Sequence, residues 1–285
     1  MIRAKTSRLA SFTAALALAL VAVLASPSSA APSFAPAEEA TIQPGVQMFT
    51  EGAQCTANFI FTDGASVYIG YAAHCAGTGA ATDTNGCDAA SLPLGTPVEI
   101  DGASRPGRLA YSSWATMQAV GETDADTCAY NDLALVEIDP ADHGAVNPSV
   151  PHWGGPIGLN TDGVAAGSRV YSYGNSSLRQ GITLLSPKTG LSLGTTGGGW
   201  THPLYTVSPG IPGDSGSAFL DAEGRALGVL STLSVAPTPL SNNVSDLSRG
   251  LDYMHANTDL DAVDLVDGTE AFDGDQLPLG LGLRR

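Results

Sequence analysis

The segment Gly213-Asp214-Ser215-Gly216-Ser217 places one serine between two glycines. Glycine reaches backbone angles that other residues avoid, so it can aim its own amide at a neighbouring group. Ser215 is therefore a candidate nucleophile, and the amides of Gly213 and Ser215 are candidate donors to an oxyanion formed beside it. A plain β-turn would also favour these glycines, so the interpretation depends on partners elsewhere in the chain.

Two upstream motifs supply such partners. A serine hydroxyl is a poor nucleophile at neutral pH unless a base accepts its proton and a third group orients that base. His74 lies in the sequence Ala-Ala-His-Cys, and Asp132 begins an apolar run in Asn-Asp-Leu-Ala-Leu. The order His, Asp, Ser differs from the orders in subtilisin-type enzymes and in α/β-hydrolases, so it selects one of three unrelated scaffolds.

These three motifs, 58 and 83 residues apart, resemble those of the chymotrypsin (trypsin-like) family of secreted serine proteases over residues 55–260. The resemblance implies an all-β fold of two six-stranded antiparallel β-barrels with a C-terminal helix. It implies His74, Asp132 and Ser215 as the catalytic triad of a serine endopeptidase that forms an acyl-enzyme without a cofactor or a metal. It also implies an oxyanion hole made by the amides of Gly213 and Ser215.

The resemblance further implies a substrate pocket. Pro209, six residues before the nucleophile, would lie at its base, and Ser231 and Leu233 would belong to the strand that pairs with the substrate backbone. Because Pro209 is not acidic, we expect a preference for apolar or small side chains rather than for Arg or Lys. A glutamyl-specific pocket is an alternative, for which His202 is the candidate.

Asp214 is expected to be a buried charge beside the site, and such a charge requires a partner. In the digestive branch of the family that partner is an α-amino group released by cleavage. Ile42 is the best match here, but the family's Ile-Val-Gly-Gly signature is absent. An internal arginine, Arg169 or Arg179, is the alternative partner, as in bacterial branches of the family.

The four cysteines of an exported chain predict two disulfides, with three possible pairings. The resemblance implies a bond between Cys55 and Cys75, which leaves Cys87 for Cys128. A zinc site is the competing interpretation, but no Cys-x-x-Cys motif or paired histidine spacing is present.

Residues 1–30 have the features of a secretory signal peptide: basic residues, an apolar stretch over about 12–24 and small residues ending at Ala30. An uncleaved membrane anchor is the alternative, although the stretch is short for a membrane span.

Without residues 1–30 the chain has nine Lys and Arg residues against 28 Asp and Glu residues, a formal charge of −19. This charge disfavours nucleic acid and anionic membranes as partners. We expect a secreted, extracellular monomer whose partner is a polypeptide substrate.

The 34 glycines and 18 prolines favour many short strands joined by turns. We expect a leader or pro-segment over 31–45, a protease domain over 46–266 and a flexible tail over 267–285. Within the domain we expect the first barrel over about 50–140, a linker over about 141–167, the second barrel over about 168–245 and the helix over about 246–258. Expected strands are 57–61, 67–71, 97–100, 133–138, 168–173, 181–185, 203–207, 217–220 and 226–231.

Two other functions use the same residues. A secreted binding module could retain the scaffold without productive pocket geometry, although the presence of His74, Asp132 and Ser215 argues against it. An esterase could use the same triad on small acyl groups. It would act on acyl esters and fail on peptides.

Overall fold

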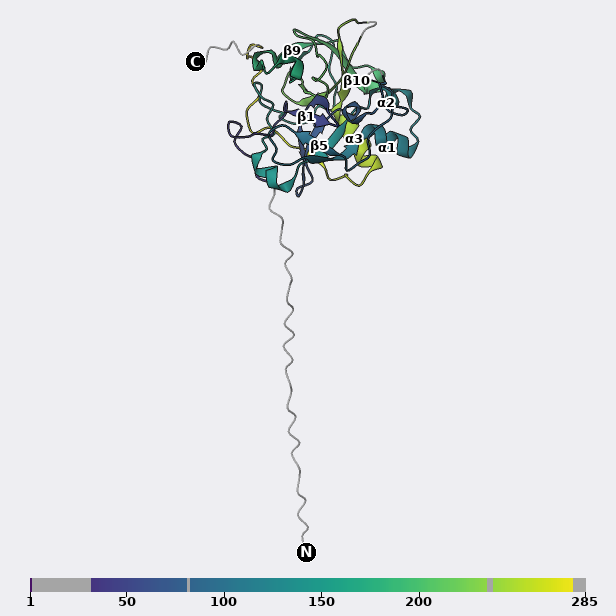
Figure 1. Cartoon of the computed structure of the whole chain (residues 1–285), viewed down its shortest axis with the longest axis vertical. Coiled ribbons are helices and arrows are strands. Elements are labelled where there is room, and N and C mark those ends of the chain that lie inside the picture. The colour runs from purple at the N-terminus through teal and green to yellow at the C-terminus, as the bar shows by residue number, and fades with distance from the viewer. Residues whose placement is uncertain (2–31, 81–82, 235–237, 279–285) are drawn as a thin grey trace.

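The computed structural model describes Met1 and residues 32–80, 83–234 and 238–278. Two antiparallel β-sheets form the framework of the molecule, with β1 and β5 in one half and β9 and β10 in the other (Figure 1). The proposed signal peptide, apart from Met1, lies outside the described residues. Within the described ranges, no helix is long and apolar enough to span a membrane.

The first sheet has eight strands in the order β14-β3-β4-β7-β6-β5-β1-β2. Its centre is apolar on both faces, because all five residues of β4 are buried and β7 buries three of its four. The C-terminal strand β14 extends the sheet by pairing with β3. The strands are β1 (Gln47–Thr50), β2 (Ala53–Thr56), β3 (Ile60–Thr62), β4 (Val67–Tyr71), β5 (Pro97–Ile100), β6 (Gly107–Ser112), β7 (Ala134–Glu137) and β14 (Asp264–Leu265).

The second sheet is a closed six-stranded barrel in the order β10-β13-β12-β11-β8-β9. Its interior is filled by a small apolar cluster that includes Val170, Leu204 and Phe219. The strands are β8 (Arg169–Tyr173), β9 (Pro187–Ser192), β10 (Thr201–Thr206), β11 (Ala218–Leu220), β12 (Ala226–Leu233) and β13 (Asn242–Asp246). The predicted all-β architecture with a six-stranded second barrel is confirmed, whereas the first half forms an eight-stranded sheet in place of the expected six-stranded barrel, because β2 and β14 add strands at its two ends.

The predicted C-terminal helix is present as α3 (Leu247–Asn257). Asp246 begins it, because its side chain accepts a hydrogen bond from the amide of Arg249 and satisfies an otherwise unpaired donor of the first turn. Leu251 and Met254 lie on its buried face. Two short helices that we did not expect, α1 (Ser113–Val120) and α2 (Ala125–Tyr130), lie between β6 and β7.

The expected strand over 181–185 is wrong. This segment contains the 3-10 turn η4 (Thr183–Leu185), and its three side chains are not buried. Gln180 and Gly181, which precede η4, have positive φ angles of 52° and 75°, and these angles interrupt an extended backbone. The barrel strand in this region is instead β9, which pairs with β8 and β10.

The expected leader over 31–45 is packed onto the linker after β7 where the structure describes it. Ile42 is fully buried, and its amide donates to the carbonyl of Ala145 at 3.1 Å. Asn147 donates to the carbonyl of Ala35 at 2.7 Å. Residues 32–45 therefore belong to the folded body in this structure.

The C-terminal segment is also ordered by contacts, whereas we expected a flexible tail from residue 267. The ring of Phe272 lies 5.2 Å from that of Tyr171 in an edge-to-face arrangement. The amide of Asp273 donates to the carbonyl of Trp153 at 2.8 Å, and the carbonyl of Glu270 accepts from Gly155 at 3.0 Å. The tail expectation is therefore wrong for residues 267–278, while residues 279–285 lie outside the described part.

Candidate active site

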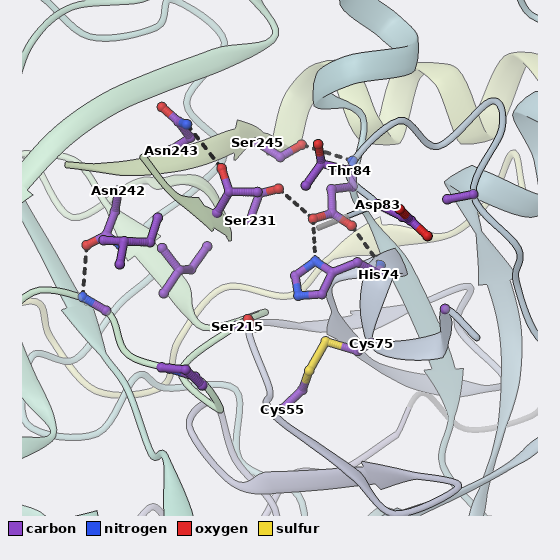
Figure 2. Close-up of a pocket in the computed structure, with 18 of the residues that line it drawn as sticks. Cys55, His74, Cys75, Asp83, Thr84, Ser215, Ser231, Asn242, Asn243 and Ser245 are labelled. Carbon is purple, nitrogen blue, oxygen red and sulfur yellow. Dashed lines mark hydrogen bonds and ion pairs between the residues drawn. A yellow bond between two sulfur atoms is a disulfide. The ribbon is translucent and has the colours of Figure 1, made fainter. Parts of the chain in front are cut away.

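An open cleft of about 860 Å³ brings together residues from both halves of the chain (Figure 2). His74 reaches it from the 3-10 turn η1 (Ala73–Ala76), Asp132 from the segment just before β7, and Ser215 from the turn just before β11. The three residues that the sequence motifs selected therefore line one site.

His74 is held by Asp132 at two points. The backbone amide of His74 donates to Oδ1 of Asp132 at 2.9 Å, and its ring nitrogen Nδ1 lies 2.7 Å from Oδ2. A carboxylate accepts hydrogen bonds, so this contact places the proton on Nδ1 and leaves Nε2 as the basic nitrogen. Ser215 lines the same cleft as the imidazole of His74 (Figure 2).

The carboxylate of Asp132 is itself buried and oriented. Its residue is 3% exposed, and the hydroxyl of Ser231 donates to Oδ2 at 2.6 Å. The amide of Asp132 donates to the hydroxyl of Ser245 at 3.2 Å. Both serines come from the second barrel, whereas Asp132 and His74 come from the first half, so the site is assembled across the junction.

The environment of His74 changes its basicity. Burial of the ring opposes protonation, but the charge and the hydrogen bond of Asp132 outweigh it and raise the pKa of His74 above the ordinary value of 6.5. A histidine of this kind is a stronger base than a free imidazole.

The turn that carries Ser215 requires glycine. Gly213 has a φ angle of +94°, and a Cβ atom there would lie 2.2 Å from Oε1 of Gln54. The amide of Asp214 donates to Ile211, and that of Gly216 donates to Leu230. Within the described part of the chain, the amides of Gly213 and Ser215 make no such bond.

Asp214 points away from the cleft into a buried cluster of charges. Its Oδ2 accepts from Arg179 and lies 3.0 Å from Nζ of Lys188. The amides of Ser176 and Ile211 also donate to the carboxylate, at 3.0 and 3.1 Å. Arg179, one of the two expected internal arginines, is therefore a partner of Asp214.

The other suggested partners of Asp214 serve elsewhere. Arg169 is an exposed residue of β8, and the amide of Ile42 is used in a backbone hydrogen bond. The sequence did not indicate Lys188, whose side chain is fully buried. Burial lowers the pKa of Lys188 and Arg179 acts in the same direction, while Asp214 opposes both. For Asp214, burial works against ionisation, but Lys188 and Arg179 outweigh it and lower the pKa.

Two of the three expected substrate residues line the cleft, and the third is not among the described residues that line it. Ser231 and Leu233 line the cleft, but the hydroxyl of Ser231 is directed to Asp132. Pro209 is not among the described residues that line the cleft, and its carbonyl faces Nζ of Lys188 at 3.4 Å. Residues that we did not single out line this part of the cleft: Gly210, Ile211, Leu230, Thr232 and Asn242. They carry no short motif that would have identified them.

His202, the candidate for an acid-binding pocket, is fully buried. Its Nε2 lies 2.9 Å from a carboxylate oxygen of Asp246, and its Nδ1 lies 3.0 Å from the hydroxyl of Thr195. Both ring nitrogens are thus engaged, and His202 is not among the described residues that line the cleft.

Both expected disulfides are confirmed. Cys55 is bonded to Cys75, which joins β2 to the turn that carries His74, and Cys87 is bonded to Cys128. Cysteine binds zinc as a thiolate, so the two disulfides remove the cysteine donors on which the zinc interpretation depended.

No protein-family model matches this chain, and no curated protein matches it. Among solved structures, Thermobifida fusca protease A is similar with a TM-score of 0.50 and 18% identity, covering 80% of this chain and 100% of that one. Nocardiopsis protease has a TM-score of 0.47 and 18% identity, with coverages of 79% and 98%. Cellulomonas bogoriensis chymotrypsin has a TM-score of 0.47 and 17% identity, with coverages of 79% and 98%. Together with the two sheets and the closed second barrel, the likeness to the Thermobifida fusca protease identifies this chain as a protein of the chymotrypsin-like serine protease fold.

Proposed function

We propose that this protein is a serine endopeptidase that hydrolyses peptide bonds through Ser215, His74 and Asp132. The observation that carries the proposal is the hydrogen-bonded pair of His74 and Asp132 beside Ser215 in an open cleft. A structural ion pair would need no access to substrate, whereas this one borders about 860 Å³ of open space.

The geometry supports a two-step reaction. Nε2 of His74 takes the proton of Ser215 as Oγ bonds to the substrate carbonyl carbon, and then gives it to the departing amine as the peptide C–N bond breaks. A water molecule next attacks the acyl-serine ester, again losing its proton to His74, and Ser215 is regenerated. Asp132 keeps the imidazole oriented and stabilises its protonated form.

Each tetrahedral intermediate carries a negative oxygen that needs fixed donors. The amides of Gly213 and Ser215 are suited to this, because the amides of Asp214 and Gly216 donate to backbone carbonyls while these two make no backbone bond within the described ranges. No charged side chain of the enzyme is needed at that position.

We propose a preference for apolar or small residues at P1, the substrate residue whose carbonyl is attacked. The cleft that contains Ser215 is also lined by Ile211, Leu230 and the exposed side chain of Leu233. A pocket of this composition gains energy by covering apolar surface, at roughly 25 cal/mol for each Å² removed from water. The burial of His202 removes the feature that favoured a glutamyl preference.

We also propose that the protein is exported after cleavage of residues 1–30. The two disulfides support this, since such bonds persist in oxidising compartments. The packing of residues 32–45 against the body indicates that the segment beyond the signal peptide stays with the folded protein.

The direct test is labelling of the purified protein with a fluorophosphonate, followed by mass spectrometry of its peptides. We expect covalent modification at Ser215, because only an activated serine attacks this reagent at a useful rate. Ser215→Ala should abolish the labelling, whereas Ser217→Ala, two residues away in the same turn, should keep it. An unlabelled, folded wild-type protein would contradict the hydrolase and favour a binding module. Cleavage of acyl esters but not of peptides would indicate an esterase.

The rate of hydrolysis should depend on the protonation of His74. The base must be neutral to accept a proton, so kcat/KM should rise with pH and reach half its maximum above pH 6.5, since Asp132 raises the pKa of His74. The contribution of the His74–Asp132 ion pair to folding stability changes with pH in the opposite direction to the rate. It is fully present below pH 6.5 and is lost as the pH rises through the pKa of His74 in the folded protein. A profile of kcat/KM against pH, measured over pH 5–9, checks the expectation, and a midpoint below 6.5 would contradict it.

A further inference from the structure

The peptide unit between Pro212 and Gly213 decides where one amide of the proposed oxyanion hole points. In a trans peptide the carbonyl and the N–H lie in one plane and point in opposite directions. The carbonyl of Pro212 accepts a hydrogen bond from the hydroxyl of Ser176 at 2.5 Å. The amide of Gly213 must therefore point away from Ser176, and Gly213 borders the cleft.

The direction of the Ser176 hydroxyl bond is settled by its second contact. The amide of Leu178 donates to the same oxygen at 3.1 Å, which occupies an acceptor position of the hydroxyl. The single hydroxyl proton is then available for the carbonyl of Pro212, which can only accept. Ser176 is 1% exposed, so water cannot easily replace it in this role.

Ser176 is also tied to the charge cluster beneath the turn. Its amide donates to Oδ1 of Asp214 at 3.0 Å, so one residue contacts both the carboxylate before the nucleophile and the peptide that carries the Gly213 amide.

The next peptide unit is held from the first sheet. The carbonyl of Gly213 accepts from the hydroxyl of Thr56 at 2.7 Å and from the side-chain amide of Gln54 at 3.0 Å. Gln54 also donates to the carbonyl of Cys55 and accepts from the amide of Ser177. These bonds hold the peptide unit that follows Gly213. The orientation of the preceding unit, which contains the Gly213 amide, depends on the hydrogen bond from Ser176.

We propose that Ser176 is a positioning residue for the oxyanion hole, holding the Gly213 amide toward the substrate. The proposal rests on the proposed hydrolytic function. Glycine tolerates more than one orientation of its flanking peptides, so the same residue that permits this turn would also permit the amide to turn away. The hydroxyl of Ser176 removes that freedom before the substrate binds.

The experiment compares Ser176→Ala with Ser177→Ala and Ser176→Thr, using p-nitrophenyl acetate as the substrate. For Ser176→Ala we expect kcat to fall about 10- to 100-fold, since misplacing or losing one oxyanion donor costs on the order of 10²-fold or more. KM should change less than about threefold, because the amide acts mainly in the transition state. Ser177→Ala, which removes the exposed neighbouring hydroxyl, should match the wild type, and Ser176→Thr should recover most of kcat because it restores a hydroxyl.

A purely structural role would give a different pattern. Circular dichroism at the assay temperature gives the folded fraction of each variant, and a fall in kcat no larger than the fall in that fraction would overturn the proposal. So would a Ser176→Ala variant with kcat within twofold of the wild type, while the wild type is labelled at Ser215. If the wild type neither hydrolyses the ester nor is labelled at Ser215, the proposed function fails, and the positioning role fails with it.

Discussion

Replacing His74 with alanine is expected to lower kcat about 10⁶-fold on a peptide p-nitroanilide with an apolar P1 residue. The hydroxyl of Ser215 would then lose the base proposed to accept its proton, and the carboxylate of Asp132 could not replace it because it is engaged by the amide of His74 and by Ser231. KM should change little, because the imidazole contributes to the transition state and not to the pocket wall. Steady-state kinetics of the purified variant give both constants.

A double variant tests whether His74 and Ser215 act in the same reaction. In a triad that acts as a unit, losing the base costs about as much as losing the nucleophile. The kcat of Ser215→Ala/His74→Ala should therefore lie within about threefold of the kcat of each single variant. His143→Ala is the matched control, because the ring of His143 bonds to the carbonyl of Ile138 and His143 is not among the described residues that line the cleft. Multiplicative losses in the double variant would show that the two residues do not share one reaction.

The parts of the site that the sequence predicted are those with short, contiguous signatures. The glycines around Ser215 are required by backbone angles that other residues avoid, and the residues around His74 and Asp132 form equally local motifs. The disulfide next to His74 followed from the same resemblance. Local sequence could therefore place the three side chains of the proposed triad, because each lies in a particular turn.

The partners that hold those side chains have no such signature. Lys188 lies on β9 between a proline and a threonine, and nothing nearby in the sequence reveals that its ammonium group reaches Asp214. Ser176 and Gln54 contact the nucleophile turn from 36 and 159 residues away. Contacts of this range depend on how the two sheets dock, which propensity and periodicity do not encode.

The packing of the two terminal segments onto the body was not predicted for a related reason. Residues 32–45 and 267–278 lack apolar periodicity, so they resembled a leader and a tail. Their order comes from single contacts, such as the burial of Ile42 and the packing of Phe272 on Tyr171. A segment without regular structure can still be held firmly when the body supplies hydrogen-bond partners for its backbone.

Asp214→Asn is expected to lower the free energy of unfolding by about 3–5 kcal/mol at pH 7, because it leaves buried cations without their counter-charge. The side chain of Lys188 is fully buried and that of Arg179 is 8% exposed, so neither can be solvated in place of the carboxylate. The lowered pKa of Asp214 means that its stabilising contribution is present above pH 3.8 and is lost only as the pH falls through a still lower value. Urea denaturation followed by tryptophan fluorescence measures the change.

Two further variants separate the charge effect from a general loss of packing. Asp139→Asn replaces a half-buried carboxylate that lies 3.5 Å from the exposed side chain of Arg105, and such surface pairs contribute no more than about 1 kcal/mol. Asp214→Asn/Lys188→Met removes one of the stranded cations, so it should be more stable than Asp214→Asn alone by at least about 1 kcal/mol, as expected for residues in contact. A double variant less stable than Asp214→Asn would mean that Lys188 contributes packing rather than an unpaired charge. In that case the ion pairs of Asp214 with Arg179 and Lys188 would not be what holds the turn that carries Ser215.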